Sequence, residues 1–423
     1  MRVLWVCNQC IPVIAKHLNM EIGNKEGWLS GLSSKLLEEK ENGIELAVAF
    51  PQGEDMASFK GEYEVTAYGF PDDRANPHIY DSSLEERFKE IIDDYKPDVI
   101  HIFGTEYPHT LAVCRAAGDG KRILIGIQGL CSVYAKHYFD GLDEMLIDSY
   151  TLRDRLKKDN LRKQQEKFVL RGRNEIEALK IAGNVTGRTD WDLKYTKEYN
   201  PDAEYYFMNE TLRSNFYDGE WDYDKCEKHS IFVSQGDYPI KGLHLLLEAL
   251  PLIKEEYEDV KVYVSGQNVT GDTLKRRVLI GSYGRHLKKL IKENGLEDSV
   301  IFLGSLSADK MKERYLKSNV FVSPSVMENS PNSLCEAMIL GMPVVSGDVG
   351  GVRNLLKDKE EGLIYPALSK KELVEAVSEV FRINGTPRMK EMCEAARKHA
   401  QKTHDGDVNF ARLKEIYKQI GTK

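Results

Sequence analysis

The stretch "VSPSVMENSPNSLCEAMILGMPVVS", residues 322–346, carries the signals of one strand–helix–strand unit in the second half of the chain. It begins within a continuous apolar strand at 320–325, "VFVSPS", and leads into a helix that a Ser-Pro pair starts at about residue 331. A Gly-x-Pro triplet ends the helix, and a second apolar strand, "PVVSG", follows at 343–347. Two apolar strands joined by a helix are typical of a parallel βαβ unit.

This alternation of strands and helices recurs in both halves of the chain. Strands that are apolar throughout indicate parallel sheets that helices cover on both faces. The expected strands are 2–6, 44–50, 98–103, 122–127 and 184–187 in the first half, and 230–234, 261–266, 300–304, 320–325 and 343–347 in the second. The sequence therefore predicts an α/β protein with two Rossmann-like, doubly wound domains that face each other across a cleft.

A polar and aromatic stretch after about residue 205 separates the two patterns. We expect an N-terminal domain at 1–208, a C-terminal domain at 209–386, and a helical segment at 387–423 that packs back toward the N-terminal domain. Because doubly wound sheets bind ligands at the carboxyl ends of their strands, the loops after the strands are the first places to search for a site.

The composition limits the class of protein. The chain has 423 residues, 41% hydrophobic and 30% charged, with a formal net charge of −8. These values are typical of an ordinary globular protein and argue against a nucleic-acid partner. No apolar run approaches the roughly 20 residues of a membrane helix, and the N-terminal apolar run is too short for a signal peptide. We therefore expect a cytoplasmic protein.

The seven cysteines are few and scattered, which indicates free thiols in a reducing compartment. Cys7 and Cys10 form a CxxC, a spacing that suits either a metal or redox site or two buried thiols at the end of a strand. A structural zinc site needs a second pair of ligands at short spacing, and none follows. Buried thiols are the favoured interpretation.

The helix near residue 331 has the signals of an anion site. Ser330 is a favoured N-cap residue, and Pro331 is a favoured first helical residue. The next backbone amides, on Asn332, Ser333 and Leu334, then point out of the helix start, where the dipole is positive. This arrangement predicts a binding site for a diphosphate.

Two carboxylates, Glu328 and Glu336, flank that helix start. They could be ordinary surface charge, or they could bind a group rich in hydroxyls. They cannot be ligands of the phosphates, because like charges repel, but each can accept hydrogen bonds from a sugar. Lys241, in the loop before a helix of the same domain, could neutralise a phosphate leaving group.

The segment "ENSPNSLCEAMILGMPVVSGDVGG" resembles the retaining glycosyltransferases of family four, the glycosyl transferases group 1, which have the GT-B fold. The resemblance covers the second domain. The matching residues, in order, are Glu328, Glu336, Ala337, Met338, Gly341, Pro343, Gly350 and Gly351. The stretches "GRTDWD" (187–192) and "NETLRSNFY" (209–217) are similar to a bacterial branch that makes capsular or other surface polysaccharides.

The resemblance implies roles for the donor site. Glu336 would bind the ribose of a nucleotide such as UDP, and Glu328 the hydroxyls of the donor sugar. Lys241 would hold the diphosphate, with Ser330 and the amides of residues 332–334 beside it. Gln235 and Gly236 occupy the loop where the family often has an arginine, so that charge is missing here. The family needs no cofactor and no divalent metal, and retention is described as front-face attack without a protein nucleophile.

The first domain would bind the acceptor, but its sequence is less informative. Gly27 and Trp28 lie where family members have a glycine-rich loop, and Gln128 replaces a usual histidine. Glu106 and His109 are the nearest ionisable alternatives after a neighbouring strand. Each of these residues could contact the acceptor or be an ordinary loop or buried residue.

We therefore expect a cytoplasmic, retaining glycosyltransferase of the hexosyltransferase type that acts on a glycan or lipid-linked acceptor in surface polysaccharide synthesis. The alternatives are a GT-B nucleotide-sugar epimerase and a non-catalytic nucleotide-sugar binding protein. Residues 153–173 are rich in Lys and Arg. That stretch is either a solvated helix or a basic face that contacts anionic lipid at the inner face of the membrane.

Overall fold

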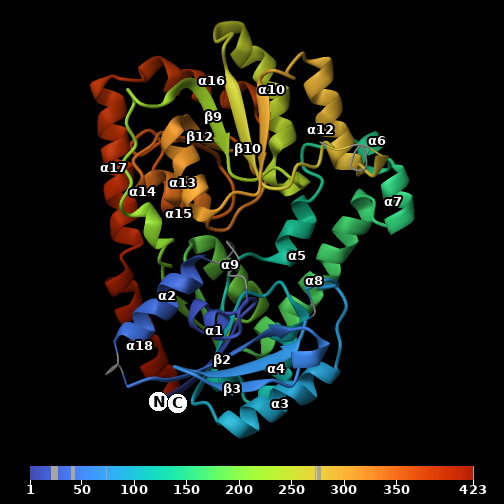
Figure 1. The fold of residues 1–423 in the computed structure, drawn as a ribbon, viewed down its shortest axis with the longest axis vertical. Helices are drawn as coiled ribbons and strands as arrows, with labels where there is room; N and C mark the ends of the chain where they lie inside the picture. Colours follow the sequence, from blue (N-terminus) through green and yellow to red (C-terminus); the bar gives the residue numbers. More distant parts are fainter. Residues whose placement is uncertain (21–26, 40–42, 73, 272, 274–277, 423) are drawn as a thin grey trace. The chain divides into compact units, whose positions relative to one another are not determined.

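The computed structural model describes residues 1–20, 27–39, 43–72, 74–271, 273 and 278–422, with only the backbone for Trp28. The chain divides into two compact units. The first unit comprises Met1–Ala135, Lys167–Arg213 and His404–Lys423, and the second comprises Lys136–Glu166 and Ser214–Thr403. Each unit contains one sheet of its own (Figure 1).

The sheet of the first unit has the strand order β3-β4-β2-β1-β5-β6-β7-β8. All neighbours are parallel except β3 and β4, which pair antiparallel at the edge. The central strands are rich in Val, Ile and Leu, as strands with both faces covered require. The strands are β1 (Arg2–Val6), β2 (Glu45–Gln52), β3 (Lys60–Glu62), β4 (Thr66–Pro71), β5 (Val99–Phe103), β6 (Ile123–Gly126), β7 (Asn184–Gly187) and β8 (Glu204–Phe207).

The helices of the first unit connect these strands and cover the sheet. Because Leu4 and Trp5 point to opposite faces of β1 and neither is exposed, both faces of the sheet are covered. The α-helices are α1 (Pro12–His17), α2 (Gly27–Glu38), α3 (Ser83–Tyr95), α4 (Pro108–Ala117), α5 (Cys131–Tyr134), α8 (Leu161–Ile181), which begins in the second unit, α9 (Asp190–Tyr199) and α18 (Gly406–Gly421).

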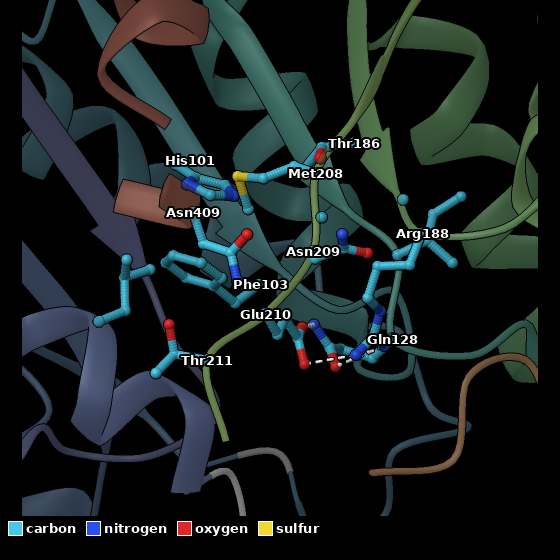
Figure 2. A pocket seen from close by; sticks show the side chains of 14 residues that line it. His101, Phe103, Gln128, Thr186, Arg188, Met208, Asn209, Glu210, Thr211 and Asn409 are labelled. Atoms are coloured by element: carbon cyan, nitrogen blue, oxygen red, sulfur yellow. Dashed lines mark hydrogen bonds and ion pairs between the residues drawn. The ribbon is translucent and has the colours of Figure 1, made fainter. Parts of the chain in front are cut away.

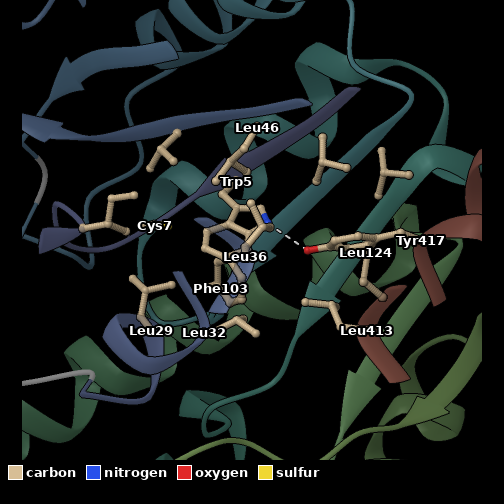
Figure 3. Close-up of a cluster of buried hydrophobic side chains, with 14 of the residues drawn as sticks. Trp5, Cys7, Leu29, Leu32, Leu36, Leu46, Phe103, Leu124, Leu413 and Tyr417 are labelled. Atoms are coloured by element: carbon tan, nitrogen blue, oxygen red, sulfur yellow. Dashed lines mark hydrogen bonds between the residues drawn. The ribbon is translucent and has the colours of Figure 1, made fainter. Parts of the chain in front are cut away.

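Trp5 lies at the centre of the buried core on one face of this sheet (Figure 3). Its ring meets Phe103 edge to face, with the centroids 5.2 Å apart. Its indole Nε1 donates a hydrogen bond to the hydroxyl of Tyr417 in α18, at 2.8 Å, and that hydroxyl is also 2.7 Å from Nδ1 of His101. The last helix of the chain is therefore anchored in the core of the first unit.

The second unit has a six-stranded parallel sheet with the order β11-β10-β9-β12-β13-β14. Every residue of its central strand β12 is buried, which explains the continuous apolar run in the sequence. The strands are β9 (Glu227–Val233), β10 (Lys261–Ser265), β11 (Val300–Gly304), β12 (Ser318–Ser323), β13 (Val344–Gly347) and β14 (Leu363–Tyr365).

Residues 136–166 belong to the second unit although the segments before and after them belong to the first. The carboxylate of Asp154 accepts hydrogen bonds from the backbone N–H and the hydroxyl of Ser282, so that it caps α12. The α-helices of the unit are α6 (Glu144–Ile147), α7 (Leu152–Lys157), α10 (Leu243–Glu256), α12 (Ser282–Glu293), α13 (Ala308–Lys317), α14 (Asn332–Ile339), α15 (Val352–Leu355), α16 (Lys370–Ile383) and α17 (Pro387–Thr403).

The two units differ from the expected domain boundaries in three ways. The junction lies at 213/214 rather than 208/209, and residues 136–166 group with the second unit. The single helical segment expected at 387–423 is two helices: α17 packs on α14 and α16 of the second unit, whereas α18 packs on α2 and β5 of the first. The physical reason is that Asp405 caps the start of a separate helix, α18. The apolar side chains of α18 are buried in the first unit.

Candidate functional site

The candidate site of the second unit lies at the carboxyl ends of two neighbouring parallel strands, β9 and β12. The loop after β9 turns at Gly242, which has φ +66°, and a Cβ there would lie 1.8 Å from the carbonyl oxygen of Pro324. Only glycine permits that approach. The backbone N–H of Val326 then donates to the carbonyl of Ile240 at 2.9 Å. These contacts hold the two loops together.

Packing of these loops places Lys241 against Glu328. Nζ of Lys241 is 2.6 Å from Oε1 of Glu328, and the hydroxyl of Ser325 donates to the same oxygen at 2.8 Å. The side chains of Lys241 and Glu328 are 20% and 9% exposed. Burial alone would lower the pKa of Lys241, but the charge of Glu328 outweighs it and raises the pKa. A fixed positive charge therefore lies at the mouth of the site.

A glycine turn after β13 supports Glu328 from behind. Gly350 has φ +50°, and a Cβ there would lie 1.7 Å from the carbonyl oxygen of Glu328. The N–H of Gly351 donates to that carbonyl at 3.2 Å. The Gly-Gly pair is therefore required for the position of the loop that carries Glu328.

Helix α14 begins one residue later than predicted. Pro331 is the N-cap and Asn332 the first helical residue, so the prediction of Ser330 as N-cap was wrong. The N–H of Leu334 donates to the carbonyl of Pro331 at 3.0 Å and is already occupied. The hydroxyl of Ser330 is buried and has no hydrogen-bond partner among the described residues. An unpaired buried hydroxyl is costly, so its place beside the helix start suits a ligand that pairs with it.

Both glutamates are buried, Glu328 with 7% and Glu336 with 5% of its surface exposed. Glu336 lies in the second turn of α14, in the same unit as Glu328. This burial excludes the interpretation of the pair as ordinary surface charge, because isolated surface carboxylates stay solvated.

Gln235 and Gly236 follow β9 in the same loop as Lys241. A Cβ at Gly236 would lie 2.5 Å from Cδ2 of Leu243, so the backbone of this loop packs closely on the start of α10. The side chain of Gln235 lies beside Gly266, at the end of β10.

A polar cluster lies beyond the carboxyl ends of the strands in the first unit (Figure 2). Gln128, Arg188 and Glu210 follow the neighbouring strands β6, β7 and β8. Nη1 of Arg188 is 2.5 Å from Oε2 of Glu210, and Nε2 of Gln128 donates to Oε1 of Glu210 at 2.6 Å. The Arg188 and Glu210 side chains are only 4% and 7% exposed. The cluster borders a cavity of about 20 Å³, which is room for about one water molecule.

The sequence arguments named Gln128 but missed its partners. Arg188 and Glu210 lie in the stretches 187–192 and 209–217, which had been used only for the resemblance. The available signal was positional, since Arg188 follows the short buried strand β7 and Glu210 follows β8, which is only partly buried. Pairing of the two charges could not be predicted, because it depends on the order of strands in the sheet.

The other acceptor candidates do not join this cluster. His109 is fully buried in α4, with Nε2 3.0 Å from Oδ1 of Asn8 and its ring against Phe70. The side chain therefore belongs to the core and presents no surface to a ligand. Glu106 is half-buried; burial raises its pKa, and its Oε2 has no partner among the described residues. Neither residue lines the cavity beside Gln128.

Gly27 begins α2, where a Cβ would lie 2.0 Å from Cγ of Arg213. Close packing thus explains this glycine without a ligand. The side chain of Trp28 lies outside the described residues, so its role as an acceptor contact stays a prediction.

All seven cysteines are free, including Cys7 and Cys10. Within the described ranges, no group of three or more His, Cys, Asp or Glu side chains has the arrangement of a metal site. No helix among the same residues is both long and apolar enough to cross a membrane.

The family description "Glycosyl transferases group 1" matches residues 218–402, the part of the chain that carries Lys241, Glu328 and α14. The match covers residues 218–402, somewhat less than half of the chain. The matched residues comprise most of the second unit.

Curated relatives share part of the chain. A phosphatidyl-myo-inositol mannosyltransferase of Mycobacterium leprae is 27% identical over 201 residues, which cover 47% of this chain and 49% of that protein. A putative colanic acid biosynthesis glycosyltransferase of Salmonella typhimurium is 28% identical over 40% of each chain. The chain thus spans about half the length, or less, of these curated relatives.

Solved structures match the whole chain. Sucrose-phosphate synthase of Thermosynechococcus elongatus has a TM-score of 0.70 at 15% identity and covers 99% of this chain and 98% of its own. The Anabaena protein HepE, solved with UDP and glucose, has a TM-score of 0.68 at 14% identity over 99% and 100%. The predicted fold class, an α/β protein of the GT-B fold with two Rossmann-like domains, is confirmed.

Proposed function

We propose that this protein is a nucleotide-sugar-dependent, retaining glycosyltransferase of family four. The observation that carries the proposal is the ion pair of Lys241 and Glu328 next to the start of α14, within the residues that match the group 1 description. A positive charge, a helix start and an unpaired buried hydroxyl on Ser330 suit a diphosphate, and two buried carboxylates suit the hydroxyls of its sugar and ribose.

In the proposed reaction, the bond from the sugar C1 to the leaving phosphate oxygen breaks and a bond from C1 to the acceptor oxygen forms on the same face. The acceptor proton moves to the leaving phosphate oxygen. Lys241 stabilises the charge that develops on the diphosphate, and the amides of Asn332 and Ser333 at the start of α14 add to it. Glu328 orients the donor sugar and Glu336 the ribose. This reaction requires no divalent metal and no protein nucleophile.

The donor is proposed to be a UDP-sugar, as bound by the similar protein HepE. The acceptor is proposed to be a glycan or lipid-linked glycan of a surface or capsular polysaccharide, which the colanic acid and mannosyltransferase relatives support. In the first unit, the acceptor is proposed to contact Gln128, Arg188 and Glu210.

Donor binding is the direct test of this proposal. A panel of UDP-, GDP- and ADP-sugars is expected to include a UDP-sugar that raises the melting temperature of the protein. Loss of the charged acceptor in Glu336→Ala should weaken that affinity by about 1.5–3 kcal/mol, or roughly 10- to 150-fold. Calorimetric titration of both proteins checks the value, with the exposed Glu293→Ala as matched control.

Three outcomes separate the alternatives. A panel without any stabilising nucleotide sugar, or equal affinity in Glu336→Ala, would contradict the donor site. Epimerised sugar from a UDP-sugar incubated alone would favour an epimerase. Binding without release of UDP in the presence of acceptor extract from cells that make surface polysaccharide would favour a non-catalytic binding protein.

We also propose that the protein acts in the cytoplasm at the inner face of the membrane and contacts anionic lipid through the basic stretch 153–173 together with the adjoining residues 145–152. Four large apolar side chains are exposed within residues 145–156: Met145 (84%), Tyr150 (51%), Leu152 (54%) and Leu156 (68%). The exposed basic residues Arg155, Lys157 and Lys158 lie among them in or next to α7. Apolar side chains next to cations are typical of a surface that binds anionic lipid.

The double variant Leu152→Ser/Leu156→Ser is expected to bind vesicles with 30% phosphatidylglycerol about tenfold more weakly than the wild type, since it loses two apolar contacts. Flotation with the vesicles measures the bound fraction. Leu252→Ser, an exposed leucine of α10, serves as control. Equal binding of the double variant, or no binding of the wild type, would contradict the lipid contact.

A further inference from the structure

A large pocket of the second unit lies away from the candidate site. It has a volume of about 840 Å³ and is formed by the segment 220–225, the end of α14 and one face of α17. Its α17 residues recur at helical spacing, which places them on one face: Met389, Lys390, Cys393, Glu394 and Arg397. Figure 1 shows α17 running beside α14.

The pocket lies near the amino-terminal end of β12, whereas Lys241 and Glu328 lie beyond the carboxyl ends of the strands. Trp221, in its wall, donates from Nε1 to the carbonyl oxygen of Ser318 at 2.7 Å, and Ser318 is the first residue of β12. Glu328 follows the other end of that strand. At roughly 3.3 Å per residue, the six-residue strand separates the two places by on the order of 17 Å.

Arg397 is the least satisfied side chain of the pocket. Its Nη1 is buried and has no hydrogen-bond partner among the described residues. The guanidinium lies over Gly341 at the end of α14, since a Cβ on that glycine would be 3.8 Å from Nη1. The negative end of the helix dipole stabilises the charge, but it leaves the N–H unpaired. A buried donor without partner is expensive. Arg397 as a whole is half-buried and lines the pocket, so the accessible part of its guanidinium can donate to a ligand oxygen there.

The other residues that line the pocket indicate which class of ligand it would bind. The half-buried aromatic residues Trp221 and Tyr223 supply apolar ring surface. Four carboxylates and three cations also line the pocket: Glu220, Asp222, Asp224, Glu394, Lys225, Lys390 and Arg397. The carboxylates disfavour an anionic ligand by repulsion. Rings together with charged donors and acceptors suit a neutral ligand with many hydroxyls.

We propose that this pocket is a second carbohydrate site that binds a neutral oligosaccharide, separate from the site of sugar transfer. Arg397 donates to hydroxyl or ring oxygens of the glycan, and Trp221 packs against the face of a sugar ring. The site would keep a growing glycan on the enzyme between transfers, which raises its effective concentration.

Ligand-observed NMR on the full chain tests the proposal with four probes: maltohexaose, cellohexaose, chitohexaose and mannohexaose. At least one is expected to bind the wild type, and at least about tenfold more weakly to Arg397→Gln. Arg388→Gln is the matched control on the same helix, since Arg388 is exposed, pairs with Glu379 and does not line the pocket. Lys241→Ala should bind the probe as the wild type does, because the pocket does not include Lys241.

No binding of any neutral probe, or equal binding by Arg397→Gln, would overturn the proposal. Binding only of an anionic hexasaccharide of heparin, or loss of binding in Lys241→Ala, would overturn it as well. If circular dichroism shows that Arg397→Gln is unfolded, Asp224→Asn replaces it, since Asp224 is an exposed residue of the wall. The measurement needs neither donor nor turnover, so its result is independent of the proposed transferase activity.

Discussion

Replacement of Lys241 by alanine is expected to lower the rate of UDP release at saturating donor by about 10²- to 10³-fold, the usual effect of losing one preorganised electrostatic contact. In the structure the ammonium is held 2.6 Å from Glu328, and the neighbouring charge raises its pKa, so it stays protonated at neutral pH. It can therefore stabilise the charge that develops on the leaving diphosphate. An assay of released UDP with a donor identified by the binding panel measures the effect.

The variant also removes the partner of a buried carboxylate, so stability must be measured beside activity. Ser325 still donates to Glu328 in Lys241→Ala, which limits the loss of stability. Lys289→Ala removes an exposed lysine of α12 and should leave both rate and melting temperature unchanged. A folded Lys241→Ala protein with a rate within twofold of the wild type would exclude Lys241 from the reaction.

Truncation of Trp5 to alanine is expected to lower the free energy of unfolding of the first unit by about 3–5 kcal/mol. The side chain has no exposed surface, and its loss leaves a cavity against Phe103 and removes the partner of the Tyr417 hydroxyl. Urea denaturation monitored by circular dichroism gives the change in midpoint, provided that the slope of the transition is unchanged.

Two further variants provide stability losses with which the effect of Trp5→Ala can be compared. Tyr417→Phe keeps the ring but leaves the Trp5 N–H and a ring nitrogen of His101 without their partner, so a loss of about 1–3 kcal/mol is expected. Trp191→Ala removes a half-buried tryptophan of α9 and should cost less than Trp5→Ala. A loss below about 1 kcal/mol for Trp5→Ala would show that α18 is not fixed by this core.

Several elements could be predicted because their signals are local. The continuous apolar runs of β1, β9 and β12 identify strands covered on both faces, and the alternation with helices identifies parallel sheets. The strands β3, β4, β8 and β14 were missed. The three residues of β3 and of β14 carry too little pattern, β4 contains a glycine and ends in a proline, and β8 is only partly buried. The start of α14 was placed one residue early, because Ser330 and Pro331 satisfy the same preferences in either register.

Some features of the candidate site could likewise be predicted from the sequence, and others needed the tertiary structure. Glu328, Glu336 and Lys241 were found from spacing and resemblance, but their burial and the 2.6 Å ion pair needed the packing of two loops that are 87 residues apart. His109 shows the converse, since its place after a strand suggested a ligand contact although the side chain belongs to the core.

Local sequence signals were enough to predict the two α/β domains, the βαβ unit at 322–346 and candidate residues for a diphosphate-sugar site, because backbone preference and hydrophobic pattern act over short distances. The tertiary structure was needed to show that Arg188 meets Glu210, that α18 returns to the first unit, and that an N–H of Arg397 is buried without a partner among the described residues. These facts depend on which strands and helices become neighbours, and that order results from the burial of whole faces rather than from any single motif.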